Sequence, residues 1–245
     1  MILRQFLHSD PVAASYLFGC GGKASGALVD PVGDIAPYMQ AAEALGMRIL
    51  YVIDTHLHAD HISSARALAQ ASGAEYVLFK EASALFPFKG VKDGEVLELG
   101  NVVAKVLHTP GHTPEHISLV VTDRTRSPEP WFVLTGHTLM VGDLGRTELA
   151  TSAEAGAKAL FGSVQELKAL PDYLEVLPGA YSGSVCGRKL SGKPTSTIGF
   201  ERRNNTAFRI EDEAEFVRAM TSDIPPPPPE AARNRAINSG EAVAA

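Results

Sequence analysis

The sequence contains only two cysteines in 245 residues, Cys20 and Cys186, so no disulfide framework holds the fold. It has no run near the roughly 18 apolar residues that span a membrane. Residues 9–11, Ser-Asp-Pro, interrupt the opening segment where a signal peptide would be apolar. Positive charge is not in excess either, since 28 acidic and 22 basic residues give a net charge of −6. These absences argue against nucleic acid or a membrane as a main partner and predict a cytoplasmic protein.

The remaining composition, 45% hydrophobic and 20% charged, is that of an ordinary globular protein. Short apolar runs alternate with helical spacing along the chain. The expected strands are residues 13–18, 27–29, 48–54, 75–79, 102–107, 117–121, 131–134 and 174–177, and the expected helices are residues 35–45, 62–70 and 153–170. No linker interrupts residues 1–215, so we expect one domain over residues 1–220.

A Pro-rich tail is expected over residues 221–245. Residues 224–230 include five consecutive prolines and favour an extended polyproline conformation. The sequence leaves two alternatives for this tail: a disordered end, or an arm that packs on the protein's own surface or on a partner.

The most informative stretch is His-Leu-His-Ala-Asp-His at residues 56–61. It directly follows the apolar run 48–54, so it lies on a loop at the carboxyl end of a predicted strand, where α/β proteins tend to place their sites. Three crowded imidazoles would repel one another if protonated. A divalent cation takes neutral imidazole and carboxylate as ligands, so the stretch predicts a metal site.

Three further segments follow predicted strands. His112 stands behind a Pro-Gly turn in Thr-Pro-Gly-His-Thr, His137 follows Leu-Thr-Gly, and Leu-Pro-Gly-Ala ends at Ala180. With these motifs, residues 1–210 resemble the metallo-β-lactamase superfamily, whose signature is His-x-His-x-Asp-His followed by three separate single ligands. The resemblance implies an α/β fold, the four-layer αβ/βα sandwich of two mixed sheets flanked by helices, with metal at one edge.

Within this superfamily the chain is most similar to the glyoxalase II and persulfide dioxygenase branch. Residues 145–148, Gly-Arg-Thr-Glu, resemble the Gly-Arg-Thr-Asp of the dioxygenases. Residues 183–188 and 195–202 resemble a segment of sulfur-handling members.

Two positions depart from the family pattern. His137 stands where the family has an aspartate that bridges two metals, and Ala180 stands where it has a last histidine. A second metal site would need the bridging aspartate and the last histidine together with Asp60 and His61. Because the first two are replaced here, a binuclear zinc hydrolase is disfavoured.

The resemblance implies a single iron held by His56, His112 and His137. His58 could join as a fourth ligand, which would suit zinc. Replacing the family's aspartate by the neutral imidazole of His137 leaves one more positive charge on the metal centre. We expect this charge to strengthen binding of an anionic sulfur substrate. The alternative for His137 is a residue that does not coordinate and weakens metal binding.

Other residues are expected around the metal. Asp60 and His61 are candidate catalytic residues that orient ligands or water. Arg146 and Arg188 are candidates for holding a glutathione-like carboxylate, with structural ion pairs as the alternative.

Tyr181 follows Ala180, the position where the family has its last histidine, and is expected to fill the space of that side chain. Cys186 could carry a sulfane sulfur, with a buried inert thiol as the alternative. His108 and His116 are expected to be structural.

The leading hypothesis is a mononuclear non-haem iron dioxygenase that oxidises a low-molecular-weight persulfide, such as glutathione persulfide, to sulfite. Fe(II) is the expected cofactor, with zinc as the alternative, and the expected partner is a small-molecule thiol or persulfide. One alternative is a zinc hydrolase of a thioester or lactone, in which His56, His58 and His112 hold the metal and Asp60 is the general base. Another is a degenerate member that binds metal without turnover. The resemblance also implies a homodimer.

Overall fold

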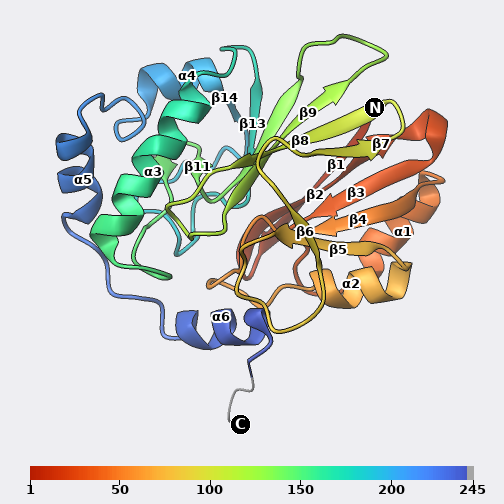
Figure 1. The fold of residues 1–245 in the computed structure, drawn as a ribbon, viewed down its shortest axis with the longest axis horizontal. Coiled ribbons are helices and arrows are strands. Elements are labelled where there is room, and N and C mark those ends of the chain that lie inside the picture. Colours follow the sequence, from red (N-terminus) through yellow and green to blue (C-terminus); the bar gives the residue numbers. More distant parts are fainter. Residues whose placement is uncertain (242–245) are drawn as a thin grey trace.

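Two six-stranded sheets face each other, and helices cover their outer faces, in the computed structural model, which describes residues 1–241 (Figure 1). In the first sheet, β1 to β3 are antiparallel and β3 to β6 are parallel. Its strands are β1 (Ile2–Ser9), β2 (Val12–Cys20), β3 (Ser25–Val29), β4 (Arg48–Ile53), β5 (Glu75–Phe79) and β6 (Lys89–Val91).

The second sheet is antiparallel except where β10 pairs with β13. Its strands in spatial order are β14 (Ser196–Thr197), β13 (Glu175–Pro178), β10 (Phe132–Gly136), β9 (Ile117–Asp123), β8 (Val102–His108) and β7 (Val96–Leu99). A small hairpin, β11 (Leu139–Met140) and β12 (Asp143–Leu144), follows β10.

The main core lies between the two sheets. Phe18 of β2 meets Phe132 of β10 edge-on, with ring centroids 6.0 Å apart. Helices α1 (Ala36–Ala44) and α2 (Ala65–Ser72) bury apolar side chains against the outside of the first sheet. Helices α3 (Ala153–Lys168), α4 (Ile198–Asn204) and α5 (Glu213–Thr221) cover the second sheet. The predicted four-layer αβ/βα sandwich is therefore confirmed.

All the predicted strands and helices are present, most of them with one or both ends shifted. Helix α2 begins at Ala65 rather than at residue 62, because residues 56–64 form the loop that carries the histidine cluster. Strand β1, several strands of two to four residues, and the three helices between residue 197 and residue 241 were not predicted from the sequence. No helix within residues 1–241 is long and apolar enough to cross a membrane.

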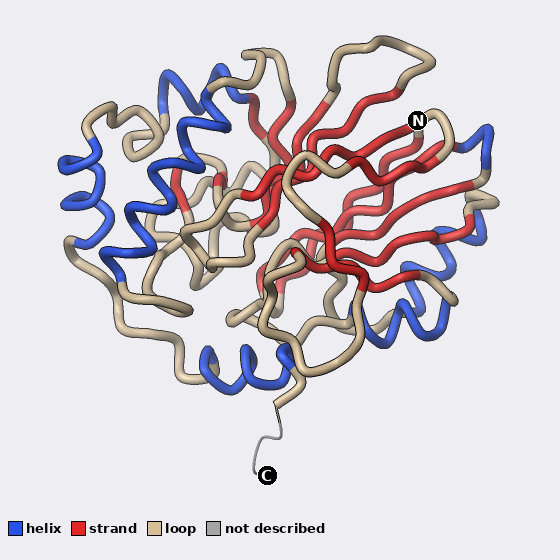
Figure 2. The backbone as a smooth tube through the Cα atoms, viewed as in Figure 1, coloured by secondary structure: helices blue, strands red, loops and turns tan. Residues whose placement is uncertain are grey.

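The Pro-rich segment is an arm that packs on the protein's own surface. After α5, residues 222–230 run along the lower edge of the domain to helix α6 (Ala231–Ser239), as the tube in Figure 2 shows. Of the two alternatives for the tail, residues 222–241 correspond to the arm packed on the protein's own surface. Residues 242–245 of the predicted tail lie outside the described residues.

Candidate metal centre

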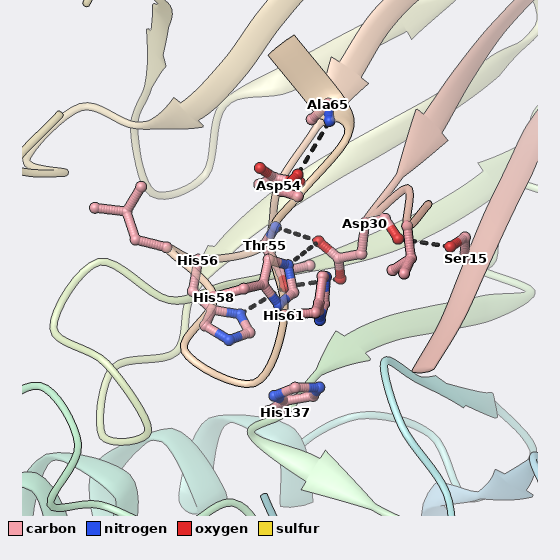
Figure 3. A network of polar contacts seen from close by, with 12 residues as sticks. Ser15, Asp30, Asp54, Thr55, His56, His58, His61, Ala65 and His137 are labelled. Atoms are coloured by element: carbon pink, nitrogen blue, oxygen red, sulfur yellow. Dashed lines mark hydrogen bonds and ion pairs between the residues drawn. The ribbon is translucent and has the colours of Figure 1, made fainter. Parts of the chain in front are cut away.

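Histidines from three loops meet at one edge of the sandwich, and each loop follows a strand. His56, His58 and His61 follow β4, His112 follows β8, and His137 follows β10. Ring centroids of contacting imidazoles among these five lie between 4.1 Å (His56 and His58) and 5.7 Å (His58 and His137) apart. All five side chains are buried. Figure 3 shows the rings of the first loop with His137 facing them across the site.

A hydroxyl group fixes the orientation of the first imidazole. The Thr55 hydroxyl donates to Asp30 Oδ2 at 2.9 Å, so its oxygen accepts from His56 Nδ1 at 3.0 Å. The neutral ring carries one proton, and a donating Nδ1 leaves a lone pair on Nε2. His56 Nε2 is buried without a partner, so this lone pair faces the interior of the cluster.

The second imidazole is held by a buried carboxylate, that of Asp30. His58 Nε2 donates to Asp30 Oδ1 at 3.1 Å, which leaves Nδ1 facing the cluster. Burial lowers the pKa of His58, but Asp30 outweighs it and raises that pKa well above 6.5, so a cation that binds Nδ1 displaces a proton. Asp30 also accepts from Thr55 N at 2.7 Å, and its backbone is left-handed, with φ of 49°. Such a conformation costs energy and persists where the surroundings require the side chain.

His137 is held on two sides by other histidines. Its backbone N–H donates to His116 Nε2 at 3.0 Å. His112 Nδ1 donates to the carbonyl of Arg146 at 2.7 Å, so His112 Nε2 accepts from His137 Nδ1 at 3.3 Å. His137 Nε2 is therefore the free atom, and it lies 3.9 Å from Asp60 Oδ2.

Four potential ligand atoms converge with no hydrogen bond between them in the described part of the chain. One ligand atom each of His56, His58, Asp60 and His137 lies within 4.8 Å of the other three. The buried atoms His56 Nε2, His58 Nδ1, His137 Nε2 and both Asp60 oxygens have no hydrogen-bond partner in the described part of the chain. Buried acceptors of this kind need a counterpart, and a divalent cation bound by imidazole and carboxylate supplies one. The donor set therefore fits a single metal ion.

The protonation states agree with this conclusion. Burial, and then the neighbouring imidazoles, hold the pKa of His56 well below 6.5. Burial lowers the pKa of His112 to about 3 and that of His137 to about 4. Burial alone would raise the pKa of Asp60, but His61 and His137 bring it well below 3.8. The site thus offers ionised carboxylate and neutral imidazole, the forms that bind metals, except at His58, whose raised pKa keeps it charged until a cation displaces its proton.

The structure also locates the other residues predicted around the metal. His61 is buried in the cluster, with Nδ1 3.2 Å from Asp60 Oδ2. Cys186 forms a second close group, in which one ligand atom each of His112, His137 and Cys186 lies within 4.8 Å of the others. Burial raises the pKa of the Cys186 thiol well above 9. Because the thiolate is the nucleophile, this supports the inert-thiol alternative over a sulfur carrier.

Arg146 has its donors occupied by its own chain. The guanidinium forms an ion pair with Glu148, and Nη1 donates to Val185 O at 3.3 Å. Nη2 donates to the carbonyl of Pro225, at 2.7 Å, in the C-terminal arm. Arg146 is 6% exposed, and these contacts favour its structural alternative, while a role in substrate binding stays a prediction.

Arg188 and Tyr181 are likewise engaged in tertiary contacts. Arg188 Nη1 donates to the carbonyls of Ala219 and Ser222 at the end of α5, at 3.4 and 3.3 Å. Tyr181 OH donates to the carbonyl of His8 at 2.7 Å. A role of either side chain in substrate binding stays a prediction.

The comparisons with known proteins agree with this geometry. A family model described as "Metallo-beta-lactamase superfamily" matches residues 10–179. Human mitochondrial persulfide dioxygenase ETHE1 is 29% identical over 231 residues, which cover 93% of this chain and 84% of that protein. Hydroxyacylglutathione hydrolase of Rhodospirillum rubrum is 27% identical, and the match covers 84% of this chain and 85% of that protein.

Solved structures are similar over nearly the whole chain. A metallo-beta-lactamase from Staphylococcus aureus is 36% identical, with a TM-score of 0.92, and the match covers 97% of this chain and 72% of that one. ETHE1 from Myxococcus xanthus is 30% identical, with a TM-score of 0.81, over 97% of this chain and 100% of that one.

Proposed function

The chain belongs to the metallo-beta-lactamase superfamily, and from this premise we propose that it is a mononuclear non-haem iron dioxygenase acting on a low-molecular-weight persulfide. With glutathione persulfide, the reaction takes up O₂ and water and gives glutathione, sulfite and two protons. The observation that carries the proposal is the convergence of four unpartnered ligand atoms on one point. Similarity to the dioxygenases from human and Myxococcus supports the substrate class.

The structure supports one metal rather than two. His56, His58, His137 and Asp60 would hold the ion. The family position of the last histidine is Ala180, which is buried and offers no ligand. Imidazole and carboxylate suit both iron and zinc, so the donor set alone does not choose between them. Bound Fe(II) would supply the reactivity toward O₂, and the protein would supply orientation and electrostatics.

The chain's own residues perform three tasks in this proposal. Asp30 and Thr55 fix the orientation of two ligand imidazoles through the hydrogen bonds described above. The burial of the whole cluster keeps bulk water away from the reacting sulfur. His61 lies beside Asp60 and outside the group of converging ligand atoms, so it is placed to exchange a proton with substrate or water.

A zinc hydrolase of a thioester or lactone is the second candidate. It is favoured by the two unpartnered oxygens of Asp60, which could act as a general base for a metal-bound water instead of as a ligand. Similarity to the hydroxyacylglutathione hydrolase from Rhodospirillum points in the same direction.

The test compares the two metals and the two reactions on one preparation. Protein freed of metal is loaded anaerobically with Fe(II) or with zinc. Oxygen uptake and sulfite are measured with glutathione persulfide, and thioester cleavage is measured with S-lactoylglutathione. We expect stoichiometric iron and persulfide-dependent oxygen uptake that is lost in His56→Ala and kept in the control His108→Ala, a half-buried residue outside the cluster. Thioester cleavage by the zinc form without oxygen uptake by the iron form would instead establish the hydrolase.

A further inference from the structure

Helix α6 is attached to the domain by polar side chains rather than by an apolar stripe. Its buried residues are Ala231, Asn234, Asn238 and Ser239. A helix usually gains its tertiary stability by burying an apolar face, and burying amides is costly unless each is hydrogen-bonded. The partners of the two asparagines therefore explain why the helix lies where it does.

Asn238 holds the main chain of the metal-binding loop at three points. Its Nδ2 donates to the carbonyls of His58 and His61, both at 2.8 Å. Its Oδ1 accepts from the backbone N–H of Ser63 at 2.9 Å. One side chain thus uses both amide hydrogens and its oxygen on the loop that carries Asp60.

Two neighbours on the same helix extend this contact. Asn234, one turn before Asn238 on the same face, donates from Nδ2 to the carbonyl of Ala59 at 3.1 Å. Arg235 donates from Nη1 to the carbonyl of Leu57 at 2.8 Å and forms an ion pair with Glu115 at 3.1 Å. Helix α6 therefore reaches the main chain of residues 57, 58, 59, 61 and 63.

The loop depends on these donors because it has little regular structure of its own. Residues 56–62 belong to no helix or strand, so a sheet ladder does not satisfy their buried carbonyls. Where the donors sit decides the path of the loop, and the path of the loop decides where its imidazoles and carboxylate point.

We infer that helix α6 is a working part of the metal centre, in which Asn238 and Asn234 are positioning residues that fix the loop backbone so that the ligand atoms converge. The inference rests on the metal site of the proposed function but not on the identity of the metal or the reaction. Residues that act on the ligands from outside typically change metal affinity by about 10–100-fold when removed.

The experiment uses the full chain and two readouts that do not depend on activity. Zinc affinity is measured by competition with a chromophoric chelator, and the visible spectrum of the Co(II)-saturated protein reports the geometry of the ligands. The variants are Asn238→Ala and Asn234→Ala. The matched control is Arg233→Ala, on the same helix, whose exposed side chain pairs, within residues 1–241, only with Glu230, at 3.4 Å.

We expect Asn238→Ala to weaken zinc binding by about 10–100-fold and to change the Co(II) spectrum at saturation. Asn234→Ala, which frees one carbonyl instead of three backbone groups, should have a smaller effect of the same kind, and Arg233→Ala should match the wild type. Wild-type affinity and spectrum in Asn238→Ala would overturn the inference. If Asn238→Ala does not fold, Asn234→Ala decides by the same criteria. A wild type that binds zinc but takes up no oxygen in its iron form would refute the dioxygenase and leave this test intact.

Discussion

Replacing Asp30 by asparagine isolates the electrostatic support of one metal ligand. Asp30 accepts three hydrogen bonds, from Thr55 N at 2.7 Å, Thr55 Oγ1 at 2.9 Å and His58 Nε2 at 3.1 Å. Asparagine has nearly the same shape and tolerates the left-handed backbone at φ of 49°. Its one carbonyl oxygen, at the Oδ1 position, can keep the bonds from the Thr55 amide and from His58 Nε2, but without the negative charge that strengthens them. The amide nitrogen at the Oδ2 position cannot accept from the Thr55 hydroxyl.

The expected effect of Asp30→Asn is a loss of about 10–100-fold in zinc affinity, equivalent to about 1.4–2.7 kcal/mol. The metal-free protein should lose about 2 kcal/mol of stability, because hydrogen bonds to a charged group contribute about 1.5–3 kcal/mol each and the buried charge, with its own cost, is removed as well. For a chain of this size that lowers Tm by roughly 4–8 °C. Chelator competition gives the affinity, and calorimetry of the metal-free protein gives Tm.

The matched control is Asp223→Asn, which makes the same chemical change at an exposed position with the same left-handed backbone, φ of 50°. It should leave both affinity and Tm unchanged. Wild-type zinc affinity in Asp30→Asn would refute the carboxylate–histidine–metal arrangement, even if Tm fell.

Three further predictions concern residues around the metal centre. His116→Ala should lower metal occupancy after dialysis several-fold, because His116 Nε2 holds the amide of His137, whereas His108→Ala should not; equal occupancy in both would contradict this positioning role. Cys186 should not react with a thiol reagent in the native protein and should react on unfolding, because burial keeps the pKa of its thiol raised. If the native protein consumed one equivalent of reagent, and Cys186→Ala did not, the thiolate of Cys186 would be accessible. Arg146→Lys should lower Tm by roughly 2–8 °C, for a loss of about 1–2 kcal/mol in the free energy of unfolding, and leave the KM for persulfide unchanged. A raised KM at unchanged Tm would instead support a contact between Arg146 and the substrate.

The ligand cluster could be predicted because each histidine directly follows an apolar run that forms a strand. Strands β4, β8 and β10 were recognisable from their apolar runs, and the loops after their carboxyl ends meet at one edge of the fold. Asp30 was missed although it carries the same signal, since it directly follows the apolar residues of β3. Strand β3 pairs in parallel with β4, which brings Asp30 to Thr55 and His58, and that pairing cannot be read from either strand alone.

The contribution of the C-terminal arm could not be predicted for a different reason. Sequence patterns reveal helices that bury an apolar stripe, and α6 buries asparagines instead. The role of Asn238 exists only through three backbone groups about 175–180 residues earlier in the chain. Arg146 was located by its motif, but its partners Val185 and Pro225 became visible only in the folded chain.

The replacement of the family's aspartate by His137 has a different electrostatic consequence once Asp60 is counted among the ligands. Two neutral histidines and one aspartate leave a divalent ion with a net charge of +1, and so do the three histidines and Asp60 that converge here. Without a second metal to bind, Asp60 is free to supply the anionic ligand that position 137 no longer offers. On this ligand set the extra positive charge expected from the sequence does not arise, because the carboxylate has changed position rather than disappeared. Asp60→Asn should create that charge, and the reduction potential of the bound iron should then rise above that of the wild type.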